Sequence, residues 1–192
     1  MSELQDKVNL TSGSPQFRFV ETADLTAPLY NYYGQVELSD DLVGMDTQDK
    51  EAKQIRLFEK VILARTGDVV FSLISGKASV VSKNHDGYLL TQNYVKLTPD
   101  DDIDARFLVY LLNEDKSIIK QFKMSMQGSM VLKYTVKQLR KIILPVIPEI
   151  DKQSIIGEIY FNQLRLTALK NRTAMTESTI VLEKLKEANS YE

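Results

Sequence analysis

Cysteine and histidine, two common catalytic residue types, are almost absent from this sequence. The chain contains no cysteine and a single histidine, His85. These counts exclude a thiol nucleophile, a zinc–thiolate site and a histidine-rich metal site. His85 lies in an Asn-His-Asp-Gly stretch, which predicts a turn in which the histidine is solvated rather than catalytic. Glu51 and Lys53 form a Glu-x-Lys pair like part of a nuclease site, but no upstream acid is well placed to complete it.

Larger catalytic motifs are also missing from the sequence. It has no Walker A pattern, no glycine fingerprint after a strand and no nucleophile elbow. It also lacks the Asp/Asn-Pro-Pro-aromatic tetrapeptide expected of an amino-methyltransferase. We therefore expect a binding protein that is not an enzyme and that uses no metal and no cofactor.

The basic residues are concentrated in one part of a chain whose formal net charge is −2. No acidic residue occurs from Lys116 to Pro148, whereas acidic residues gather at positions 37–51 and 100–104. Contacts to phosphates require a basic surface, so this stretch is a candidate nucleic-acid face. A solvated helix face is the simpler alternative. The basic residues are Lys116, Lys120, Lys123, Lys133, Lys137, Arg140 and Lys141.

Short apolar runs broken by turn residues predict the strands that would carry this face. Runs at 61–63, 69–74, 78–82 and 88–97 are rich in β-branched and aromatic residues. Their spacing favours a mainly antiparallel sheet or a partly closed barrel. Residues 1–15 are expected to be irregular, residues 17–25 to form a short strand and turn, and residues 29–53 to be mostly loop.

Helical spacing begins after Asp100. Apolar residues from Ile103 to Leu112 predict one helix, and residues 117–126 predict a second. The acidic residues before Ile103 suit the N-terminus of the first helix. A short helical turn is expected at 136–140, with strand-like segments at 131–134 and 141–146.

Residues 149–190 predict one long helix. A heptad seam runs through it, and a second apolar stripe contains Ile155, Ile159 and Leu166. Some forty residues make a rod of about 60 Å, which is too long for the remaining residues to cover. A helix with two apolar stripes needs two partners. We expect antiparallel self-association through Phe161, Leu164, Ala168, Asn171, Met175, Ser178, Leu182 and Leu185.

Motifs from Gly67 to Arg172 resemble, in their order and spacing, the target-recognition domain of type I restriction–modification DNA specificity subunits. The resemblance rests on several short segments, none of them specific when taken alone. These are Gly67-Asp68-Val69-Val70-Phe71-Ser72, Ser75-Gly76-Lys77, Thr91 to Leu97, Phe107 to Leu112, Gln127-Gly128-Ser129, Leu139 to Pro145, and Pro148 to Ile156.

The resemblance implies an α+β fold: a mainly antiparallel or partly closed β recognition domain with short helices at 1–148, then a long coiled-coil helix at 149–190. The implied function is sequence-specific recognition of double-stranded DNA at a bipartite target. A full specificity subunit carries two recognition domains and two long helices, so this chain resembles a half-subunit that works as a homodimer. Separate modification subunits would bind S-adenosylmethionine and methylate adenine, and a restriction subunit would cleave. We expect a cytoplasmic chain without a membrane span.

Candidate DNA contacts follow from residue type. Lysines set register on phosphates, whereas side chains with paired donors and acceptors recognise base edges. Gln92 is equally compatible with a strand residue satisfied by the backbone. The phosphate candidates are Lys77, Lys120, Lys123 and Lys133, and the base candidates are Asn31, Gln92, Gln127 and Ser129.

Two other functions remain open at this point. The chain could be a scaffold that joins proteins through a coiled-coil tail without binding DNA. It could also be a decayed specificity fragment without partner subunits. A DNA-binding protein should lose affinity as salt rises, whereas a scaffold should not bind DNA at all.

Overall fold

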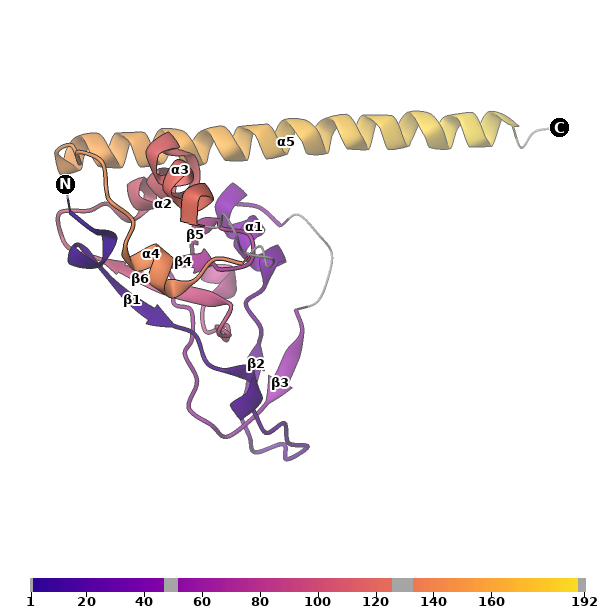
Figure 1. Cartoon of the computed structure of the whole chain (residues 1–192). Coiled ribbons are helices and arrows are strands. Elements are labelled where there is room, and N and C mark those ends of the chain that lie inside the picture. The colour runs from indigo at the N-terminus through magenta and orange to yellow at the C-terminus, as the bar shows by residue number, and fades with distance from the viewer. Residues whose placement is uncertain (1, 47–51, 126–132, 190–192) are drawn as a thin grey trace.

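A four-stranded antiparallel sheet forms the centre of the head, by which we mean the described residues up to 148. The computed structural model describes residues 2–46, 52–125 and 133–189. The strand order is β1-β6-β4-β5, so the strand nearest the N-terminus pairs with β6 (Figure 1). The strands are β1 (Val8–Ser12), β4 (Val69–Ser72), β5 (Ala78–Val80) and β6 (Tyr94–Pro99).

The centre of the sheet is shielded from solvent because β4 carries apolar side chains on both faces. Every residue of β4 is buried. The ring of Phe71 is stacked on the ring of Phe122, which belongs to a helix outside the sheet. The β4–β5 turn needs a glycine at Gly76, whose φ is +68°. A Cβ at Gly76 would meet the Tyr134 ring at 2.4 Å. The turn and Tyr134 therefore fix each other's position.

Helices cover the sheet and begin where the sequence provides caps. Asp104 starts α2 by accepting a hydrogen bond from the Phe107 backbone N–H at 2.9 Å. Thr135 and Gln138 start α4 with a capping box. The helices are α1 (Gln35–Val43), α2 (Ala105–Glu114), α3 (Lys116–Ser125), α4 (Val136–Arg140) and α5 (Ile150–Asn189).

A smaller antiparallel pair lies at the end of the head opposite α5 (Figure 1). It consists of β2 (Leu29–Asn31) and β3 (Gln54–Arg56). Ile55, Leu57 and Leu89 form a small buried core behind it. Short 3₁₀ turns complete the head: η1 (Leu4–Asp6), η2 (Gln16–Arg18) and η3 (Lys83–His85).

The long helix α5 is attached to the head through its N-terminal half, where it packs on α2 and α1. The buried amide of Gln153 accepts a hydrogen bond from the Asp104 N–H at 3.0 Å. It also donates to the carbonyls of Asp102 at 2.8 Å and Pro148 at 2.9 Å. Gly157 packs against α2, where a Cβ would lie 2.7 Å from the Cβ of Arg106. We call this set of contacts the α5 clasp.

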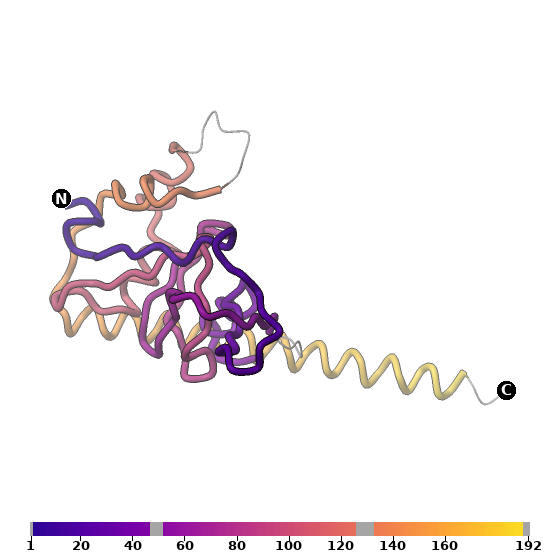
Figure 2. Tube along the Cα trace, turned by 90° about the horizontal axis from the view of Figure 1, so that it is seen from below, coloured from indigo at the N-terminus to yellow at the C-terminus, as the bar shows by residue number. Residues whose placement is uncertain are grey.

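Beyond the clasp, Tyr160, Phe161 and Arg165 still contact the head, and from residue 169 α5 continues as a free rod. Figures 1 and 2 show its C-terminal part extending away from every other element. From residue 169 to residue 189 every side chain is exposed. The sheet, the short helices and this rod confirm the predicted α+β class.

The structure corrects several local predictions. Residues 29–53 were expected to be loop, yet they contain β2 and α1, and residues 1–15 contain β1. Residues 16–18 form a 3₁₀ turn rather than a strand. Within 141–146 the structure has only an isolated bridge, between Ile143 and Glu3. The strand-like prediction at 131–134 lies partly outside the described residues.

Among the described helices, none combines the length and apolarity that a bilayer crossing needs.

Candidate nucleic-acid interface

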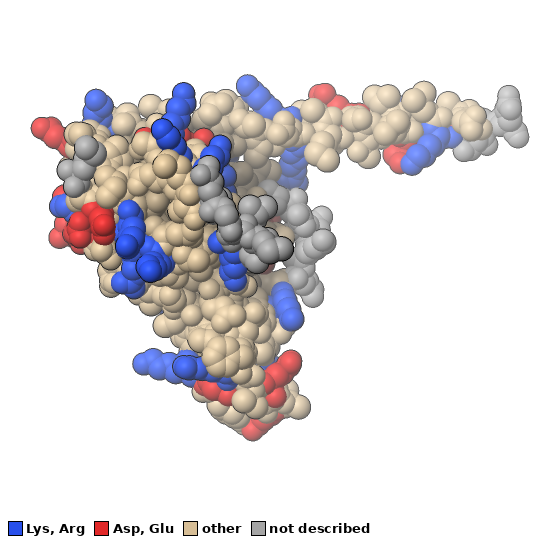
Figure 3. Space-filling view, viewed as in Figure 1, with Lys and Arg blue, Asp and Glu red and all other residues tan. Residues whose placement is uncertain are grey.

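The lysines of α3 point away from the core. Ile118 and Phe122 occupy one face of α3 and are buried, which leaves Lys120 and Lys123 exposed on the opposite side. Neither lysine forms an ion pair with a described residue, and the same holds for the exposed Lys116, Lys137, Arg140 and Lys141. Figure 3 shows Lys and Arg side chains spread over this face, with Asp and Glu at its left edge and lowest tip. The face can bind phosphates.

Lys133 and Gln92 are brought together by the turn before β6. The Lys133 ammonium donates to the Asn93 Oδ1 at 2.8 Å, and Asn93 is the neighbour of Gln92. Gln92 lies in that turn rather than in a strand, and its side chain is exposed. Only its backbone N–H is bonded, to the Ser14 carbonyl at 2.9 Å. The side chain therefore makes no hydrogen bond to another described residue.

Lys77 is partly neutralised inside the chain. Its ammonium donates to the Asn113 carbonyl at 3.3 Å and lies 3.7 Å from the Glu114 carboxylate. Glu114 in turn accepts a hydrogen bond from the Tyr160 hydroxyl of α5 at 3.0 Å. The structure thus places Lys77 at the C-terminal end of α2, beside α5.

Asn31 lies on β2, in the smaller antiparallel pair, away from these lysines. Its Oδ1 accepts a hydrogen bond from the Gln54 Nε2 on β3 at 2.9 Å. Sequence analysis missed Gln54, because three-residue strands are too short to show an alternating pattern. Gln127 and Ser129 lie outside the described residues.

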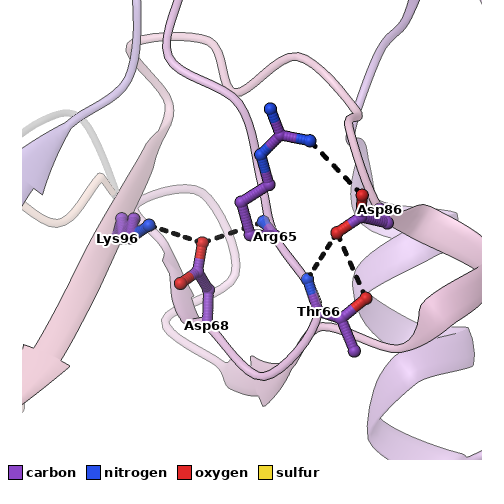
Figure 4. Close-up of polar contacts among 5 residues, drawn as sticks. All are labelled: Arg65, Thr66, Asp68, Asp86 and Lys96. Atoms are coloured by element: carbon purple, nitrogen blue, oxygen red, sulfur yellow. Dashed lines mark hydrogen bonds and ion pairs between the residues drawn. The ribbon is translucent and has the colours of Figure 1, made fainter.

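On the side of the sheet away from α3, the cations Lys96 and Arg65 form ion pairs with aspartates (Figure 4). The Asp68 carboxylate binds the Lys96 ammonium at 2.7 Å and the Arg65 backbone N–H at 2.8 Å. The Asp86 carboxylate binds Thr66 through its backbone N–H at 2.8 Å and lies 3.3 Å from the Arg65 guanidinium. These contacts hold the turn at Gly67, so Arg65 and Lys96 have structural roles.

His85 is not the solvated turn residue that its sequence context predicts. Its Nδ1 lies 2.8 Å from the buried carboxylate of Asp41, which also accepts from the Tyr33 hydroxyl at 2.7 Å. Burial alone lowers the pKa of His85, but the hydrogen bond to Asp41 and the charges of Asp41, Glu37 and Asp40 raise it above its usual value. His85 is buried because the η3 turn packs against α1, a helix that was not predicted from the sequence.

The His85–Asp41 pair is a structural contact between η3 and α1. Asp41 also accepts from the Ser82 backbone N–H at 3.1 Å, so three donors surround one carboxylate. Within the part of the chain that the structure describes, no cluster of three or more His, Cys, Asp or Glu residues could hold a metal ion.

The predicted dimerisation seam has a partly buried section near the head and an exposed section farther along the rod. Phe161 is half-buried against the head, with the Arg106 guanidinium 5.9 Å from its ring centre. Leu164 and Ala168 are partly exposed. Farther along the rod, the exposed members are Asn171, Met175, Ser178, Leu182 and Leu185, and Met175 is 72% exposed.

Comparison with known families gives the decisive observation. The family model described as "Type I restriction modification DNA specificity domain" matches residues 21–176. The chain belongs to this family. The match covers most of the head, the α5 clasp and α5 as far as residue 176, so the lysine face and this part of α5 belong to one specificity domain.

Solved structures share the fold of this specificity domain. The HsdS subunit from Thermoanaerobacter tengcongensis aligns with a TM-score of 0.59 at 17% identity, over 97% of this chain and 42% of that one. A chain from a study of complex assembly and conformational transition in the type I R-M system gives 0.60 at 18%, over 97% and 43%. The S subunit from M. genitalium gives 0.54 at 15%, over 96% and 43%.

The specificity domain spans less than half the length of each of these three chains. Comparison with curated proteins gives no match.

Proposed function

We propose that this specificity domain selects the DNA target of a type I restriction–modification complex. The observation that carries the proposal is the family match over residues 21–176. The exposed lysines of α3 support it, because they have no anionic partner among the described residues and can neutralise phosphates. We assign phosphate contacts to Lys120, Lys123, Lys133 and Lys77, and base contacts to Asn31, Gln92, Gln127 and Ser129.

Recognition and spacing are assigned to different parts of the chain. Residues 1–148 contact DNA, and residues 149–190 form the dimerisation and spacer helix. Methylation and cleavage come from separate modification and restriction subunits, so this chain has no catalytic role. Because one head recognises one half-site, two copies are needed for a bipartite target.

The dimer forms through α5 in an antiparallel arrangement. Apolar side chains on the rod are exposed along both stripes, including Leu182 and Leu185 on the seam and Ile159 and Leu166 on the second stripe. Exposed apolar surface of this extent favours a partner helix. A two-fold axis near Asn171 lets each seam pair with its own copy. Sedimentation equilibrium at tens of micromolar should give a dimer, and a monomer would refute this arrangement.

A salt titration separates this function from a scaffold role. For the specificity domain, the logarithm of DNA affinity should fall linearly with the logarithm of salt concentration. A scaffold joined through α5 would not bind DNA at any salt concentration. Mapping of methylated adenines after co-expression with a candidate modification subunit then tests the full proposal, and it should give one bipartite sequence.

A further inference from the structure

The β2–β3 pair, with the segments beside it, forms a separate lobe at the end of the head. We define the lobe as residues 15–33 and 52–63. Its small core consists of Ile55 and Leu57 from the lobe together with Leu89 from the segment before β6, with Tyr30, Phe19 and other half-buried side chains packed on them. In Figure 1 the lobe projects on the side of the head opposite α5. A projection with its own core can present side chains in fixed positions.

The ribbon formed by β2 and β3 has one face buried and one face open. Tyr30 and Ile55 are paired and face the lobe core. The neighbouring pairs, Leu29 with Arg56 and Asn31 with Gln54, fall on the opposite face by strand alternation. Leu29 is 46% exposed, and Gln54 is also exposed. No described element covers this outer face.

The Asn31–Gln54 pair presents one free donor and one free acceptor. With the Gln54 Nε2 donating to the Asn31 Oδ1, the Asn31 Nδ2 and the Gln54 Oε1 have no partner among the described residues. Turning both amides over leaves the same two functions free on exchanged residues. In the major groove, adenine presents the N7 acceptor beside the N6 donor. The free functions of the pair therefore complement an adenine edge.

The surroundings of the pair suit a DNA groove. The lobe cations Arg18, Lys53, Arg56 and Lys60 form no ion pair with a described residue. The lobe carboxylates are Glu21, Asp24 and Glu59, one fewer than the cations, and Figure 3 shows Asp and Glu side chains at the lowest tip, so the cations of the lobe must make the phosphate contacts. A two-stranded ribbon fits the width of the B-DNA major groove. Exposed apolar side chains nearby, such as Phe58, can meet thymine methyl groups.

We propose that the β2–β3 ribbon enters the major groove of the half-site and that the Asn31–Gln54 pair recognises one adenine there. This inference rests on the proposed function and adds to it a recognition element and a specificity residue, Gln54. The lysines of α3 then position the head on phosphates, while the ribbon selects the sequence.

Selection from a random-sequence duplex pool tests the ribbon with the full-length chain. Asn31→Ala and Gln54→Ala should each remove the preference for adenine at one position and leave the other positions unchanged. Affinity for the parent site should fall roughly 5- to 150-fold, the range for loss of a bidentate base contact. Gln163→Ala, which removes an exposed amide from α5, is the matched control and should leave every preference unchanged.

A second variant guards against loss of folding. Gln54→Glu keeps the size of an exposed side chain but leaves only acceptors, so it should shift the preference at that position from adenine to cytosine. An enriched sequence for the parent that is unchanged in all three variants would overturn the ribbon alone and would indicate that its open face binds something other than DNA. A pool that is not enriched even by the parent would overturn the proposed function, and this inference with it.

Discussion

In the proposed function, Lys120 and Lys123 position DNA without selecting its sequence. Both lie on the exposed side of α3, without an anionic partner among the described residues. Replacing both with alanine should weaken binding to all sequences equally. The slope of log affinity against log salt should become shallower by up to about 2, since each lost phosphate contact removes about 0.9.

The matched control for this pair is Lys170→Ala, which removes an exposed cation from the rod. It should leave the salt slope of the parent unchanged. If the double variant altered base preference but kept the parent slope, the division between positioning and recognition would be wrong.

His85 makes part of the stability of the head dependent on pH. Its folded-state pKa is raised above the ordinary 6.5, chiefly because the hydrogen bond and charge of Asp41 outweigh burial. A raised pKa stabilises the fold fully below the unfolded-state value, and this stabilisation is lost as pH rises through the folded-state value. The unfolding free energy lost in His85→Gln should therefore be larger at pH 6 than at pH 8.

Urea unfolding of both proteins at the two pH values measures this difference. Asn84→Gln, at the exposed neighbour of His85, is the control and should show no such dependence. An equal loss at both pH values would mean that the pKa of His85 does not change on folding, and a larger loss at pH 8 would mean that the contact with Asp41 uses neutral His85.

At the scale of elements, the α5 clasp reverses the usual effect of a helical glycine. Alanine in place of glycine inside a helix normally stabilises by about 1 kcal/mol. At Gly157 the added Cβ would lie 2.7 Å from the Arg106 Cβ and 2.9 Å from the Phe107 backbone nitrogen. Gly157→Ala should instead destabilise the protein by about 1–3 kcal/mol, the range for overpacking.

Thermal and urea unfolding check the sign of this effect. Ser154→Ala lies on the same part of α5 but is exposed, so it should change stability by less than about 0.5 kcal/mol. A stabilised Gly157→Ala protein would show that α5 does not pack closely on α2.

The sequence predicts the elements whose patterns are long. β4, β6, α2 and α5 have clear apolar runs or helical spacing, and all four are present. α1 was missed because two of its buried residues are aspartates, Asp40 and Asp41, which hide its apolar face. β2 and β3 were missed because each has three residues.

The residues of the candidate site likewise fall into those that the local pattern predicts and those that it does not. The exposure of Lys120 and Lys123 follows from the periodicity of α3, so it could be predicted locally. The partners of other site residues lie far away in the sequence: His85 meets Asp41, Lys77 meets Asn113, and Asn31 meets Gln54. Only the folded chain brings these residues together.

At the scale of the whole molecule, an antiparallel dimer gives both heads the same half-site preference. The target should then be an inverted repeat around an unrecognised spacer. A rod of about 60 Å limits the spacer to roughly eighteen base pairs at ~3.4 Å each. The real spacer should be shorter, because the heads overlap the rod ends.

Changing the rod by one heptad tests its role as a ruler. Seven added residues between Asn171 and Ser178 should move the heads apart by about 10 Å and lengthen the preferred spacer by about three base pairs. Each half-site should stay the same. Methylated-adenine mapping with the modification subunit provides the measurement. An asymmetric parent target, or a spacer unchanged by the added heptad, would refute the ruler.

The α5 clasp has a mechanical consequence, because a long helix held at one end is a lever. Gln153 and Gly157 hold the first turns of α5, and Phe161 and Arg165 continue its contact with the head, so residues 169–189 are the part that amplifies any tilt of the helix. A tilt of about 10° swings the far end of this free part, about 30 Å long, by roughly 5 Å, which exceeds the ~3.4 Å rise of one base pair. If the chain works as the proposed dimer, the stiffness of the contacts between α5 and the head limits how far the spacing between the two half-sites can vary.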